Sequence, residues 1–81
     1  MVTSESIKQN IEQGMTQTYL TVAGDGTHFE AVVVSEEFVG KSRIQRHQRV
    51  YQTLGDRMRN EIHALSMKTY TPQEWESSRS T

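Results

Sequence analysis

The chain has 81 residues, a formal net charge of −1 and no cysteine, and residues 1–81 are expected to form one domain with a stability on the order of 5 kcal/mol. Without cysteine the chain forms no disulfide and builds no thiolate metal site by itself. No apolar run approaches the roughly 20 residues of a membrane span, and the N-terminal residues lack the basic start and apolar core of a secretory signal, so the sequence predicts a cytoplasmic protein without membrane association.

A helix is the first predicted element, from Ser4 to Gln13. Ser4 is a suitable N-cap, and Ile7 and Ile11 lie four residues apart on one face. Gly14 favours the end of the helix.

Two strands and a tight turn follow. Residues 16–23 are rich in β-branched and aromatic side chains, with Leu20 and Val22 on one face, and residues 24–26 favour a hairpin turn into a second strand over residues 28–35. The second strand has apolar side chains on both faces: Phe29, Ala31 and Val33 on one, Val32 and Val34 on the other. Such a strand is expected to be central or covered.

The main helix is predicted from Ser42 to Leu54. Ser42 and Gln45 have the spacing of a capping box. One apolar sector of this helix comprises Ile44, His47, Val50, Tyr51 and Leu54. Gly55 is expected to break or kink the helix, and residues 56–60 favour a further short helical turn.

The last predicted elements are a strand over residues 64–70, with Leu65 and Met67 on one face, and a helical turn starting at residues 71–75. Residues 77–81 are expected to be frayed. The pattern by itself predicts helices packed on a small sheet.

Five segments in order resemble the BolA family. They are Thr27 to Ser35, Phe38-Val39-Gly40, Arg46 to Tyr51, Ile62-His63-Ala64-Leu65 and Thr71-Pro72-Gln73-Glu74-Trp75, and the resemblance runs from about Ile7 to Trp75. The short loop at residues 24–26 resembles the short-loop, acid-stress branch of that family. The resemblance implies an α/β (α+β) fold of the type II K-homology-like kind, with a three-stranded mixed sheet and helices packed on one face.

His63 is the strongest candidate for chemistry, because it stands where the short helix ends and the last strand begins. The resemblance implies that this histidine is a ligand of a [2Fe-2S] cluster shared with a monothiol glutaredoxin, which brings a cysteine and bound glutathione. Imidazole replaces thiolate on one iron in Rieske centres, so the chemistry is coherent. From position alone, a ring hydrogen-bonded to a carbonyl at the helix end is the competing interpretation.

The second ligand departs from the family pattern, in which the first loop between strands carries a cysteine or histidine. Asp25 stands nearest that place, and His28 begins the next strand. Carboxylate is an unusual ligand of iron–sulfur clusters. Three alternatives therefore remain: His28 ligates, Asp25 ligates weakly, or a water or the partner fills the position. For His28 a packing role at the start of the strand is equally open.

His47 falls in the middle of the apolar sector of the main helix. A histidine at such a position is usually a core residue with satisfied hydrogen bonds. We therefore expect His47 to be buried, neutral and hydrogen-bonded.

Basic residues are concentrated between Lys41 and Arg59, where six basic residues and one acidic residue give a local charge of +5. Arg43, Arg46 and Arg49 recur every third residue along the expected exposed part of the main helix, beside Lys41. Arginine forks match phosphates, so this face predicts either a nucleic-acid contact or a merely solvated helix surface. The chain has no Gly-x-x-Gly clamp and no overall basic charge, which both count against nucleic acid.

Tyr70 and Trp75 form an aromatic pair near the C-terminus. One interpretation is an exposed contact for a partner, and the other is that Trp75 folds back over the end of the sheet.

The sequence contains no nucleophile with a spaced base, no phosphate-cradling loop and no convincing pair of carboxylates. The sequence therefore predicts a protein that is not an enzyme. The BolA resemblance implies an adaptor in iron–sulfur and redox homeostasis that binds a monothiol glutaredoxin, and without a thiolate of its own the chain is expected to hold no cluster alone. Alone, the chain is expected to be a monomer or weak homodimer. The alternatives are a DNA-binding transcriptional regulator of the stress response that uses the helix over residues 42–54, and a bare interaction module.

Overall fold

The structure, a computed structural model, describes residues 3–61 and 64–79, and side chains are described for 3–55 and 65–79. The elements in chain order are α1 (Ser4–Gly14), β1 (Tyr19–Gly24), β2 (His28–Val34), the short 3₁₀ helix η1 (Glu36–Phe38), α2 (Arg43–Glu61), β3 (Ala64–Tyr70) and α3 (Pro72–Arg79). The predicted order of helices and strands is confirmed. Two differences are the added η1 and the length of α3, which continues through residues 77–79, where the sequence predicted fraying.

The three strands form one mixed sheet in the order β1-β2-β3. β1 and β2 are antiparallel and pair Leu20 with Val33, whereas β2 and β3 are parallel and pair His28 with Ala64. β2 is therefore the central strand, as its apolar residues on both faces predicted, and β3 lies at one edge.

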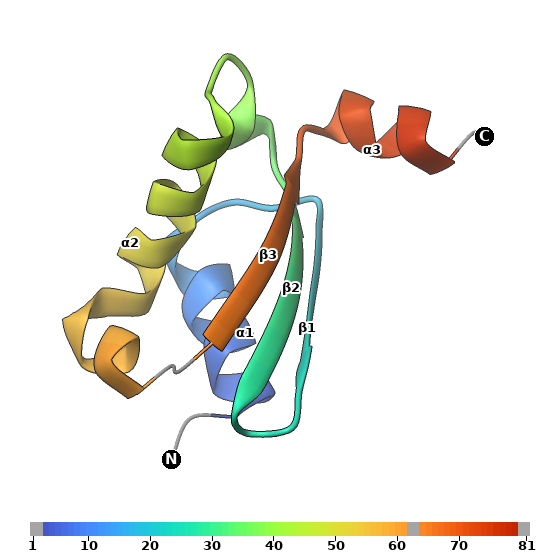
Figure 1. Cartoon of the computed structure of the whole chain (residues 1–81). Helices are drawn as coiled ribbons and strands as arrows, with labels where there is room; N and C mark the ends of the chain where they lie inside the picture. Colours follow the sequence, from blue (N-terminus) through green and yellow to red (C-terminus); the bar gives the residue numbers. More distant parts are fainter. Residues whose placement is uncertain (1–2, 62–63, 80–81) are drawn as a thin grey trace.

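α1 and α2 cover one face of this sheet, as expected, while α3 lies at the end of the sheet on the other side (Figure 1). The core between the helices and the sheet is continuous. It contains Ile7, Ile11, Met15, Leu20, Phe29, Ala31, Val33, Phe38, Val50, Leu54 and Met67. Among the described helices, none has both the length and the apolar character needed to cross a membrane.

The helix starts follow local capping chemistry. Thr3, rather than the predicted Ser4, caps α1, because its Oγ1 accepts the Ser6 N–H at 3.0 Å while Ser6 Oγ accepts the Thr3 N–H at 3.0 Å. The predicted capping box before α2 is confirmed: Ser42 Oγ accepts the Gln45 N–H at 3.2 Å, and Gln45 Oε1 accepts the Ser42 N–H at 2.9 Å. Each box satisfies two backbone donors that the helix leaves unpaired.

The predicted apolar sector of α2 is correct for the later turns and wrong for the first. Val50 and Leu54 are buried, but Ile44 is 70% exposed. Gly14, the last residue of α1, lies beside Thr53, so α1 ends below the first turn of α2 (Figure 1). Helical periodicity predicts which side chains share a face but not how far the neighbouring helix reaches along it.

Two glycines are required by the packing and by the backbone. A Cβ on Gly14 would lie 2.7 Å from the Cβ of Thr53, so the close approach of α1 and α2 depends on glycine there. Gly55 has φ 72° and ψ 168° and breaks α2 into two helical segments, which confirms the predicted kink. This backbone region is essentially restricted to glycine.

Candidate functional site

The turn between β1 and β2 is organised by Asp25. Its Oδ1 accepts the N–H groups of Thr27 and His28, both at 2.9 Å, and the Asp25 N–H donates to the His28 carbonyl at 3.2 Å. The His28 and Thr27 backbone donors hold the pKa of the Asp25 carboxyl below its usual range. Asp25 thus has a structural role within the turn. Its role as a cluster ligand stays a prediction.

His28 is exposed at the first position of β2 and pairs in register with Ala64, the first residue of β3. Ala64 follows His63 directly in the chain, and His63 itself lies outside the described residues. Across the described part of the chain, no three His, Asp or Glu side chains gather in a way that could hold a metal ion. The described donors therefore fit a metal group only if further ligands come from elsewhere.

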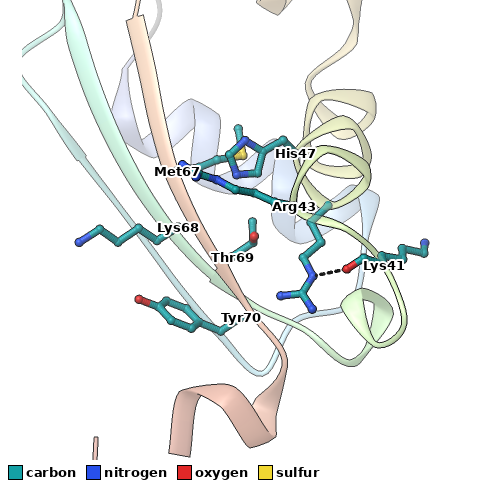
Figure 2. Close-up of a pocket in the computed structure, with 8 residues that line it drawn as sticks. Lys41, Arg43, His47, Met67, Lys68, Thr69 and Tyr70 are labelled. Atoms are coloured by element: carbon teal, nitrogen blue, oxygen red, sulfur yellow. Dashed lines mark hydrogen bonds between the residues drawn. The ribbon is translucent and has the colours of Figure 1, made fainter. Parts of the chain in front are cut away.

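His47 does not have the sealed environment predicted for it. Its side chain is half-buried, faces β3 from α2 beside Met67, and makes no hydrogen bond to the described residues (Figure 2). Burial lowers the pKa of His47, and the nearby Arg43 guanidinium lowers it further. The predicted neutral state fits this environment, whereas the predicted full burial and hydrogen bonding were wrong, because α2 packs beside an edge strand whose far side is open.

A groove of about 420 Å³ runs between α2 and β3 (Figure 2). It is lined by Lys41, Arg43, Arg46, His47, Met67, Lys68, Thr69 and Tyr70. Lys41 and Arg43 were predicted as part of a basic surface, and the structure brings both to this groove. The sequence did not predict that Lys68 from β3 would join them, because that depends on the strand lying beside α2.

Arg46 was expected on an exposed face, but its side chain is only 14% exposed. It forms a two-pronged ion pair with Glu74 at 2.7 and 3.1 Å, and its Nε donates to the Lys41 carbonyl at 3.0 Å. The Glu74 carboxylate raises the pKa of Arg46. The guanidinium thereby connects α2 to α3.

Arg49 is likewise committed within the molecule and not freely exposed. Its Nε donates to Glu37 Oε1 at 2.9 Å and its Nη2 donates to the Gly14 carbonyl at 3.0 Å. Sequence reasoning missed Glu37, because it is 12 residues away from Arg49 and no local spacing indicates the pair. Arg46 and Arg49 are therefore both paired with carboxylates. Of the four basic residues predicted for this surface, Lys41 and Arg43 make no ion pair within the described residues.

Trp75 folds back over the end of the sheet, which was one of the two interpretations of the sequence. Its ring stacks on Tyr19 with centroids 5.0 Å apart and lies against Tyr70 at 5.2 Å with a tilt of 55°. Tyr19 was not expected to take part, although its place opposite the core face of β1 was visible in the alternation of that strand. Whether this aromatic cluster contacts a partner stays a prediction.

Three comparisons with known proteins agree with this geometry. The family model described as BolA-like protein matches residues 1–74. A solved bolA protein homologue from Coxiella burnetii is 51% identical, with a TM-score of 0.81, and the match covers 94% of this chain and 99% of that one. The "Acid stress protein IbaG" of Escherichia coli is 48% identical over 59 residues, which cover 72% of this chain and 70% of the relative.

A third relative, from Haemophilus influenzae, is called "DNA-binding transcriptional regulator BolA" and is 41% identical over 58 residues. The match covers 72% of this chain and 56% of that protein, so the chain spans little more than half the length of this relative. The names of these relatives describe a regulator and a stress protein. From the family match over residues 1–74 and the agreement of the folds, the chain belongs to the BolA family.

Proposed function

We propose that the protein is a non-enzymatic adaptor that shares a [2Fe-2S] cluster with a monothiol glutaredoxin carrying glutathione. The single observation that supports this most is the parallel register of β2 and β3, which pairs His28 with Ala64, the chain neighbour of His63. His28 thus lies beside the first residue of β3, and His63 directly precedes that residue in the chain.

The available ligand side chains fit a cluster that is shared with a partner and do not fit a cluster held by this chain alone. The chain has three histidines and no cysteine, and thiolates are the usual ligands of such clusters. His63 would supply one ligand, His28 or Asp25 would stand at the second position, and the partner's thiols would complete the set. When bound, the cluster would supply one-electron redox chemistry. Neutral imidazole is required for ligation, so binding would weaken on acidification.

The test is anaerobic reconstitution of the mixed complex with a monothiol glutaredoxin, glutathione, iron and sulfide. Absorbance, circular dichroism and electron paramagnetic resonance report the ligands. His63→Ala should abolish the signature of a histidine ligand and His28→Ala should alter it, while His47→Ala, in the groove, should leave it unchanged. A spectrum unaffected by His63→Ala would refute the assignment.

The second candidate function is DNA binding, which the name of the H. influenzae relative favours. Lys41 and Arg43 are exposed and make no ion pair within the described residues. Replacing both with Ala should weaken duplex binding at about 50 mM salt and reduce the slope of log affinity against log salt by about one unit for each phosphate that is no longer neutralised. Lys8→Ala on α1 is the control. No duplex binding at low salt would eliminate this candidate.

A further inference from the structure

The groove between α2 and β3 follows the free edge of the sheet. Four consecutive residues of β3, Met67 to Tyr70, line it. Successive side chains of a strand point to opposite faces of the sheet, so a groove that touches all four must run along the strand's edge. Figure 2 shows this arrangement: Met67 and Thr69 lie on the side of β3 toward α2, and Lys68 and Tyr70 lie on the other.

This edge carries backbone groups available for pairing. β3 is the last strand of the sheet, and the Tyr70 carbonyl accepts the Ser35 N–H at 2.9 Å, on the side of β2. Backbone groups alternate in direction along a strand, so those of Lys68 face β2 as well, and those of Met67 and Thr69 face the groove. No other described element donates to or accepts from these two residues. An edge of this kind is a template for an additional strand.

The groove is also strongly cationic. Among the described residues, its lining includes the cations Lys41, Arg43, Arg46 and Lys68 and no acidic side chain. Arg46 is paired with Glu74, while the other three cations have no ion-pair partner among the described residues. Potentials complementary to this surface are negative.

We propose that the groove binds an extended acidic peptide segment of a partner protein, which adds to the sheet as a fourth strand beside β3. The peptide's backbone would pair with the groove-facing N–H and C=O groups of Met67 and Thr69. Its carboxylates would meet Lys41 and Arg43 from the α2 side and Lys68 from the sheet side. In such strand addition the backbone supplies affinity and the side chains supply selectivity.

The backbone edge distinguishes this occupant from nucleic acid. A peptide strand offers the alternating donors and acceptors that match an open strand edge, and a phosphate backbone offers acceptors only. Among the described residues that line the groove, the aromatic rings are those of Tyr70 and His47. These two come from different elements and do not form a row of stacking platforms for bases. The proposal does not depend on a shared cluster or on DNA binding.

The test uses three synthetic peptides of seven residues, the length of β3. The first has adjacent pairs of glutamates separated by valine or threonine, so that carboxylates fall on both faces of an extended strand. The second has glutamine in place of glutamate, and the third repeats the first with N-methyl groups on alternate amides. Binding is followed by fluorescence anisotropy and by hydrogen exchange of the Met67 and Thr69 amides. We expect the acidic peptide to slow exchange of these two amides and each altered peptide to bind about tenfold more weakly or worse.

Variants separate the charge from the strand edge. Lys41→Glu with Arg43→Glu should weaken the acidic peptide about tenfold or more, and Lys8→Glu on α1 should not. Thr69→Pro removes an N–H that faces the groove and leaves every charge, so it should lose the peptide as N-methylation does, with the fluorescence of Trp75 checking the fold. Equal binding of the N-methylated peptide, no binding at about 1 mM, or binding of duplex DNA without the peptide would each overturn the proposal.

Discussion

At the scale of single residues, the Glu37 carboxylate in η1 accepts hydrogen bonds from two other parts of the chain. Its Oε2 accepts the Thr16 N–H at 2.7 Å and the Thr16 Oγ1 hydroxyl at 3.0 Å, and its Oε1 accepts from Arg49. Partial burial raises the pKa of Glu37, but the Thr16 donors and the Arg49 guanidinium outweigh it, so the pKa lies below its ordinary value. One carboxylate thus connects η1 to the segment between α1 and β1 and to α2.

We predict that Glu37→Gln lowers the free energy of unfolding by about 1–2 kcal/mol at pH 7, because charged hydrogen bonds are lost from a partly buried site. The effect should depend on pH. A carboxyl whose pKa is lowered in the folded state stabilises the protein above its unfolded pKa, and this stability is lost as the pH falls through the folded pKa. The difference between wild type and variant should therefore shrink as the pH falls below the ordinary glutamate pKa of 4.5 and through the lower pKa of the folded state.

Urea unfolding at several pH values measures this difference. Glu36→Gln is the matched control, because Glu36 is an exposed neighbour without the Thr16 interaction, and it should change stability by less than about 0.5 kcal/mol. A Glu37→Gln protein as stable as wild type at pH 7 would show that the charge of Glu37 contributes nothing to the free energy of unfolding.

At the scale of elements, the break in α2 at Gly55 decides where the helix changes direction. Leu54 is buried in the core, and the next residue adopts φ 72°, ψ 168°. A Cβ at Gly55 would meet nothing within 4 Å, so the cost of a side chain there is conformational and does not come from a clash with a neighbour.

Gly55→Ala should lower the free energy of unfolding by about 1–3 kcal/mol, because the required backbone region is nearly closed to other residues. Chemical denaturation followed by circular dichroism gives the value. Gln52→Ala, on an exposed position of the same helix, is the comparison and should have little effect. If both variants unfolded at the wild-type denaturant concentration, the kink would not be a constraint.

At the scale of the whole molecule, α3 joins the helical layer to the opposite face of the sheet. Glu74 of α3 holds Arg46 of α2, and it also accepts the Thr71 N–H at 2.9 Å as part of its own helix cap. On the other face Trp75 stacks on Tyr19 of β1. The C-terminal helix therefore closes the end of the sheet from both sides.

Trp75 is the chain's single tryptophan, so its fluorescence reports whether α3 stays docked. Tyr19→Ala should shift the emission to longer wavelength and lower stability by about 0.5–1.5 kcal/mol, the range for an aromatic pair. Thr21→Ala, exposed on the same strand, should leave the emission unchanged. An unshifted spectrum in Tyr19→Ala would mean that the stack does not hold the helix.

Local signals in the chain were sufficient for most elements. β3 was predicted with its observed bounds, because Leu65 and Met67 alternate with polar residues up to the helix-start signal at Thr71-Pro72. The Ser42–Gln45 box located the start of α2. The central place of β2 followed from apolar residues on both faces. Each of these inferences uses residues close together in the sequence.

The candidate site was less predictable, because it depends on which distant elements meet. The basic residues were visible in the sequence, yet only packing decided that Arg46 and Arg49 bind Glu74 and Glu37 while Lys41 and Arg43 line a groove with Lys68. The surroundings of His47 also depend on packing between distant elements. Because α2 lies beside β3, the edge strand, His47 faces an open strand edge and is not sealed in the core.

Composition and short-range pattern alone were sufficient for the order of helices and strands, the absence of cysteine ligands and the BolA-like motifs, because periodicity, caps and turns are properties of neighbouring residues. The pairing of His28 with Ala64, the commitment of two arginines to ion pairs and the open edge of β3 came from the tertiary structure. Those features arise from interactions between residues far apart in the chain, and a short stretch of sequence does not show which distant residues come into contact.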